Sequence, residues 1–184
     1  MFISRLWLAF LGVILLNGLW FTTACAQSGS SYYDQYTAQG KYRFFGQIHD
    51  HFEVTQYLKG ATIRIRSEYG GELVLQADEQ GEFETTLDFG VNYVVFFEDS
   101  GYVTKYLAVE LQDAEEKYLD PNCTPYPIRV SMLEDVDGVD YHLFENPVGS
   151  IVLDPDNRCF DWVIGMSEKD YSRLIRTVRK KSSR

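Results

Sequence analysis

The sequence predicts an all-β protein: a seven-stranded, Ig-like sandwich with a C-terminal extension and a short terminal helix. From Lys41 onward, short segments alternate apolar and polar residues with the period of two that marks half-buried strands. Turns, several of them built on glycine, separate these segments at regular intervals, and nothing before Ser167 has a convincing helical period. The seven expected strands cover residues 42–47, 61–66, 73–75, 83–87, 93–97, 103–111 and 128–133.

The first residues have the order of a secretory signal. Arg5 gives a positive start, an apolar run follows to Phe21, and Ala24-Cys25-Ala26 forms a small-x-small cleavage site. We therefore expect cleavage after Ala26 and export to the periplasm or the cell surface. In the alternative, Thr22–Cys25 is a loose lipobox, and an acylated Cys25 anchors the protein to a membrane.

The remaining chain divides by composition. Residues 1–26 form the signal, and residues 27–40 are a polar, Tyr- and Ser-rich flexible leader. The sandwich is expected over 41–135 and a turn-rich extension packed on it over 136–166, followed by a basic amphipathic helix over 167–184. Within the sandwich, residues 113–127 are expected to form a long surface excursion.

The charge balance excludes nucleic acid as a partner. The chain has 17 basic and 27 acidic residues and a net charge of −10, whereas nucleic-acid binding depends on Lys and Arg against phosphates. The basic residues of 167–184 are an exception. In that segment Tyr171, Leu174, Ile175 and Val178 share one helical face. That face either packs on the sandwich or contacts an anionic membrane or a partner.

Two cysteines remain once Cys25 is set aside. Cys123 and Cys159 are expected to form a disulfide because an exported protein matures in an oxidising compartment. The alternative is that both thiols are free and buried.

Four sequence blocks, taken in order, resemble the carboxypeptidase regulatory-like domain, which is also called transthyretin-like. The first two are Gly46-Gln47-Ile48-His49-Asp50 and Tyr57-Leu58-Lys59-Gly60-Ala61-Thr62-Ile63. The others are the turn Ala77-Asp78-Glu79-Gln80-Gly81-Glu82-Phe83 and the pair Gly90-Val91-Asn92-Tyr93 and Gly101-Tyr102-Val103-Thr104-Lys105.

The resemblance continues downstream to exported bacterial relatives through 130–134 and 146–151, so it covers roughly Lys41 to Asp154. Tyr57 replaces a common proline, and Cys123 and Cys159 also depart from the family pattern. The resemblance implies a β-sandwich in an exported protein. It implies no catalytic residues, because the regulatory domain is not the catalytic domain of those peptidases.

Only one cluster has the residue types of a metal site. His49 and His51 lie two apart on an expected strand, which places them on one face, and Glu53 follows them. The His-x-x-Glu spacing of a carboxypeptidase zinc site is missing, so the three residues are weak candidates. No nucleophile elbow or phosphate loop occurs, and no cofactor is expected.

These observations favour a monomeric, non-catalytic binding or scaffolding module of the bacterial envelope, with a protein or glycan partner. Its expected contact surface is two loops at one end of the sandwich, Gln47–Gly60 and Asp113–Pro127. One alternative is an accessory subunit held at a membrane through Cys25 or through the 167–184 helix. A metal-dependent hydrolase using His49 and His51 is the weakest alternative.

Overall fold

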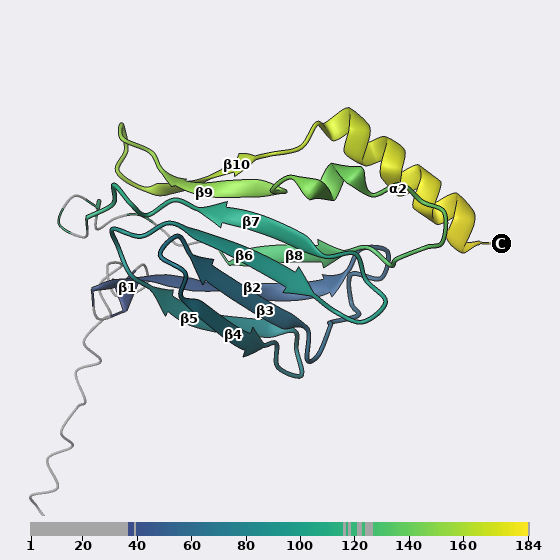
Figure 1. The fold of residues 1–184 in the computed structure, drawn as a ribbon, viewed down its shortest axis with the longest axis horizontal. Coiled ribbons are helices and arrows are strands. Elements are labelled where there is room, and N and C mark those ends of the chain that lie inside the picture. The colour runs from purple at the N-terminus through teal and green to yellow at the C-terminus, as the bar shows by residue number, and fades with distance from the viewer. Residues whose placement is uncertain are drawn as a thin grey trace, which may run out of the picture.

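The computed structural model of the chain describes residues 37–38, 40–115, 117, 119–120, 123 and 127–183. In it two β-sheets face each other and one helix lies at one end (Figure 1). The elements are β1 (Thr37–Ala38), β2 (Lys41–Asp50), β3 (Thr62–Ser67), β4 (Glu72–Gln76), β5 (Glu82–Leu87), β6 (Tyr93–Glu98), β7 (Lys105–Val109), β8 (Ile128–Met132), the 3-10 turn η2 (His142–Glu145), β9 (Gly149–Leu153), β10 (Phe160–Ile164) and α2 (Glu168–Ser182).

The all-β sandwich is confirmed as an architecture. One sheet has four strands with β2 at its centre: β5 pairs with one side of β2, and β1 and the parallel strand β8 pair with the other. The second sheet has six strands in the order β10-β9-β7-β6-β3-β4. The seven expected strands correspond to β2 through β8. The described residues contain three more, β1, β9 and β10.

Alternation along the strands builds the core between the sheets. Every second residue of β2 is buried, because one face of the strand is turned inward. Phe44 and Ile48 from this strand are fully buried, and so are Val95 and Phe97 from β6 in the opposite sheet.

Close chain contact explains one glycine in this core. A Cβ on Gly46 would collide with the carbonyl group of Ile128 and with the ring of Phe83. Glycine therefore allows β8 to lie parallel against β2 from this point of the strand onward.

The segment 136–166 does more than pack on the sandwich. Its strand β9 pairs in parallel with β7, and β10 pairs with β9, so the segment widens the six-stranded sheet. Part of the expected leader is also ordered, because Thr37 and Ala38 pair with β2 as β1. The signal segment and Cys25 lie outside the described residues.

The terminal helix packs its apolar face inward. This agrees with the alternative in which that face packs on the sandwich, not the one in which it contacts a membrane or a partner. Leu174 and Val178 are buried with Leu133 and Phe144 in a small second core. Among the described residues, no helix combines the length and the apolar composition that a bilayer span requires.

The two loops expected to share one end of the sandwich do not. Strand β8 runs parallel to β2, with Ile128 beside Gly46 and Met132 beside Asp50. Pro127, which directly precedes β8, therefore lies towards the start of β2, whereas the loop that follows Asp50 lies beyond the end of β2. Figure 1 shows the two strands running side by side, and much of 113–127 lies outside the described residues. The sequence indicated both loops but not the parallel pairing that separates them.

Candidate functional site

The two sheets do not cover each other along one side of the sandwich. The four-stranded sheet ends there at β8, while the six-stranded sheet continues to β10. Phe160, Trp162 and Ile164 share one face of β10 because side chains alternate along a strand. Phe160 is buried, but Trp162 is 41% exposed and Ile164 is 71% exposed. The inward face of β10 therefore extends past the strands that would cover it.

Beneath this overhang lies a slot between β8 and the β9–β10 hairpin. It consists of two adjoining pockets that share Arg129 and Trp162. The first has a volume of about 290 Å³ and is lined by Tyr42, Pro127, Ile128, Arg129, Ile151, Phe160, Asp161 and Trp162. The second has a volume of about 310 Å³ and is lined by Lys105, Leu107, Arg129, Val130, Ser131, Val148, Trp162, Ile164, Met166, Glu168 and Tyr171.

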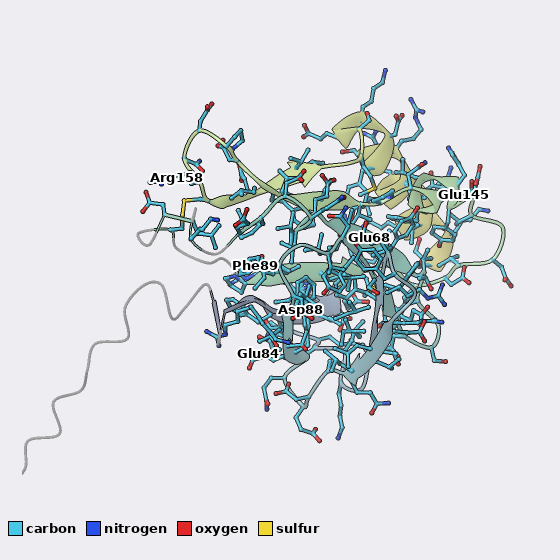
Figure 2. The ribbon with its side chains drawn as sticks, turned by 60° about the vertical axis from the view of Figure 1, so that its left-hand side comes forward. Glu68, Glu84, Asp88, Phe89, Glu145 and Arg158 are labelled. Atoms are coloured by element: carbon cyan, nitrogen blue, oxygen red, sulfur yellow. A yellow bond between two sulfur atoms is a disulfide. The ribbon has the colours of Figure 1, made fainter. Side chains whose placement is uncertain are left out.

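Both ends of the slot are tied across the two sheets. At one end, Cys123 from the segment before β8 forms a disulfide with Cys159, the residue before β10. This bond is compatible with the pairing expected from the sequence, and Figure 2 shows it beside Arg158. At the other end, the Lys105 ammonium group on β7 donates a hydrogen bond to the Ser131 carbonyl oxygen on β8.

Lys105 is an unusual residue for the inside of a sandwich. It is only 4% exposed, because it shares the inward face of β7 with Leu107 and Val109. Its Nζ lies 4.9 Å from the centre of the Phe144 ring and 5.5 Å from that of Tyr171. Cation–π attraction and one carbonyl oxygen thus stabilise the charge.

No carboxylate among the described residues forms an ion pair with Lys105. Burial in this apolar environment disfavours the charged amine and lowers the pKa of Lys105 to about 7. Near neutral pH the group is therefore divided between its ammonium and its amine forms.

The candidate metal ligands are arranged differently from a metal site. Nδ1 of His51 lies 3.2 Å from Ser131 Oγ and 3.3 Å from the Tyr171 hydroxyl, while Nδ1 of His49 lies 3.2 Å from the Val130 carbonyl oxygen. The Glu53 backbone N–H donates to the Asp50 carboxylate. Within the part of the chain that the structure describes, no group of three His, Cys, Asp or Glu side chains is placed to hold a metal.

The positions of His49 and His51 beside the slot lower the pKa values of both side chains. Burial is the main cause that lowers the pKa of His51 and of His49, and the neighbouring Lys105 charge lowers both further. Both imidazoles are therefore held towards their neutral forms. The His49 ring connects β2 to β8, while the His51 ring, just after β2, contacts Ser131 of β8 and Tyr171 of α2.

The outer edge of β10 presents backbone groups to solvent. Asp154 N donates to the Cys159 carbonyl and Gly165 N donates to the Val148 carbonyl, which fixes the alternation of the antiparallel ladder. It follows that the backbone N–H and C=O groups of Asp161 and Val163 form the hydrogen bonds to β9. Trp162 and Ile164 direct their N–H and C=O groups away from it, and β10 is the edge strand of its sheet among the described residues.

Sequence reasoning missed Lys105 and Trp162. The signal for Lys105 was present, since it continues the period-two positions of Leu107 and Val109. Strand β10 gave a weaker signal, because Trp162, Val163 and Ile164 are consecutive apolar residues and do not alternate with polar ones.

Comparisons with known proteins leave the chain without a family. No family model matches it, and no curated protein matches it. Among solved structures it is similar to a chain titled "The Bacillus anthracis TIE protein", with 20% identity and a TM-score of 0.38. The similarity covers 58% of this chain and 21% of that one. At that level it carries no argument about function, and the resemblance to the carboxypeptidase regulatory-like domain stays a prediction.

Proposed function

We propose that the protein is a non-catalytic, exported binding module of the bacterial envelope that takes an extended polypeptide segment as an added strand on β10. The observation that carries the proposal is the overhang of β10, whose inward side chains Trp162 and Ile164 are exposed above the slot. Large apolar side chains left exposed over a concave surface are typical of interaction sites.

The backbone of β10 supports this mode of binding. Strand addition uses the unpaired N–H and C=O groups of an edge strand for affinity, and pockets for alternate side chains for selectivity. The edge of β10 offers both, because Trp162 and Ile164 have outward backbone groups and line the slot with their side chains. Every second side chain of an added strand would enter the slot.

Export and membership of the carboxypeptidase regulatory-like family belong to the same proposal. The signal-like first 26 residues and the four ordered sequence blocks support them. Attachment to a membrane through Cys25 is the second possibility on the same grounds. Contact with a membrane through α2 is less favoured, since Leu174 and Val178 of its apolar stripe are buried in the second core.

A proline substitution tests the proposal sharply. Ile164→Pro removes an N–H that faces away from β9, so the ladder between β9 and β10 keeps its hydrogen bonds. Val74→Pro is the matched control on β4, the opposite edge of the same sheet. The bonds from Ser67 N to Gly71 O and from Ala77 N to Ala61 O place Val74 among the outward-facing residues of β4.

The probe is a library of random twelve-residue peptides selected on the unmodified protein. We expect the selected peptides to bind Ile164→Pro at least about tenfold more weakly and Val74→Pro with unchanged affinity. Amide exchange at Trp162 and Ile164 should slow when peptide is bound. Peptides that bind Ile164→Pro as tightly as the unmodified protein would show that β10 is not the binding edge.

A further inference from the structure

The end of the slot nearest α2 contains a cation that no carboxylate among the described residues neutralises. Lys105 is buried, lines the second pocket and forms no ion pair with the described residues. A buried ammonium group is normally paired, because leaving a charge without a counter-ion in an apolar environment is costly. The second pocket therefore presents a positive charge at a defined place.

The rest of the second pocket is mainly apolar. Leu107, Val130 and Val148 form its inner wall, while Trp162, Ile164 and Met166 form the overhanging side. A matching ligand combines apolar side chains with one negative group at the end that reaches Lys105.

The end nearest α2 also limits what kind of chain can lie there. Tyr171 of α2 lines the pocket and holds its ring against the Lys105 ammonium group. An added strand running towards α2 therefore meets the helix. Because Lys105 lies on β7, two strands inward from β10, a chain that stops at this point reaches it only if its last residue turns from the edge of β10 into the slot and places its α-carboxylate at Lys105.

We propose that the slot binds the C-terminal end of a polypeptide and that Lys105 holds its terminal carboxylate. This inference rests on the proposed function, since it specifies which extended segment β10 receives. The ammonium group has the Ser131 carbonyl oxygen and two aromatic rings as its partners within the protein. A carboxylate adds a charge-assisted hydrogen bond to the remaining N–H donors.

Proton uptake on peptide binding distinguishes a lysine that holds the carboxylate from one with a purely structural role. The pKa of Lys105 is lowered to about 7 in the free protein, and a bound carboxylate would raise it. Binding above neutral pH should then draw a proton from the buffer, and affinity should fall as pH rises. Other groups facing Lys105 are His49 on β2, His51 just after it, Arg129 on β8, and Glu168 and Tyr171 on α2, so the histidines need their own control.

The experiment compares two libraries of random hexapeptides on the full chain, one with free C-terminal carboxylates and one with C-terminal amides. We expect free-acid binders, with affinity roughly tenfold higher than that of their own amides. Lys105→Met should bind both forms equally. Calorimetry in buffers of different ionisation enthalpy should show proton uptake that is lost in Lys105→Met and kept in His51→Gln.

Each other outcome has a defined meaning. Amides that bind as tightly as free acids, in a manner sensitive to Ile164→Pro, would overturn the carboxylate site and leave strand addition to β10 intact. Proton uptake lost in His51→Gln and kept in Lys105→Met would also overturn it. Failure to recover any peptide from either library would contradict the proposed function and this inference together. Binding of decanoate without any peptide would make the slot a site for fatty acids and overturn both.

Discussion

The indole ring of Trp162 lies directly over Gly149. A Cβ at position 149 would stand 2.6 Å from Trp162 Cζ2, which is closer than real Cβ atoms approach other groups. The absence of a side chain on β9 thus lets the largest residue of the slot lie flat against its own hairpin.

Gly149→Ala should therefore displace Trp162 and reshape the slot. Trp7 and Trp20 are the other tryptophans, so in a chain that begins at Gln27 the selectively excited tryptophan fluorescence reports Trp162 alone. We expect a shifted emission maximum and a loss of peptide binding. An unchanged spectrum with unchanged binding would show that the ring does not depend on Gly149.

Gly46→Ala should separate β8 from β2. The added methyl group collides with the Ile128 carbonyl oxygen. This oxygen belongs to the backbone, so it cannot move aside as the end of a flexible side chain would. Overpacking of this kind costs about 1–3 kcal/mol of unfolding free energy. Urea denaturation measures the loss, and Gly71→Ala controls for the general effect of a glycine substitution, because Gly71 is exposed, has no positive φ and would meet only the Ser67 hydroxyl oxygen.

Lys105→Met should change how stability depends on pH. Between the folded pKa of about 7 and the ordinary value of 10.5, the unfolded chain binds a proton at Lys105 and the folded chain does not. The unfolding free energy of the unmodified protein should therefore rise with pH across this window, by on the order of a few kcal/mol. Below pH 7 both states are protonated and the full burial penalty applies.

In Lys105→Met that rise should disappear. The variant should be more stable than the unmodified protein at pH 6, and the difference should shrink or reverse at pH 10. Urea titrations at pH 6, 8 and 10 test this prediction. Parallel pH profiles for the two proteins would contradict the low pKa of Lys105.

Removing the disulfide should destabilise the fold without rearranging it. The bond joins residues 36 apart, and in the chain-entropy model closing such a loop contributes about 4 kcal/mol. Cys123→Ser combined with Cys159→Ser should lower the unfolding free energy by up to this amount. Thermal unfolding of the unmodified protein with and without reductant gives an independent measurement.

Local alternation was enough to predict the strands that build the core. The seven segments expected from it correspond to β2 through β8, and the amphipathic stripe of Leu174 and Val178 identified α2. These elements can be predicted from the sequence because each has one buried and one solvated face. The pattern along the chain then repeats the geometry of the fold.

The candidate site was much harder to predict, because it depends on which strands meet. Lys105 lies 26 residues from Ser131, and no spacing rule connects the two positions. The parallel pairing of β9 with β7 brings β10 over β8, and nothing in the sequence of β10 marks it as an edge. His49 lies on β2, and His51 follows directly after the strand ends at Asp50. Their partners, however, come from β8 and α2, which short-range patterns do not reveal.

The bond between Cys123 and Cys159 also makes a closed covalent ring that contains β8, η2 and β9. The exposed turn around Asp137 and Gly138 lies inside this ring, and exposed turns are the usual targets of proteases. A single cut there opens the ring but releases no fragment, since each new chain end stays attached through the two sulfur atoms. In an environment rich in proteases, a nicked molecule would keep β8 and β10 together and could outlast the cut.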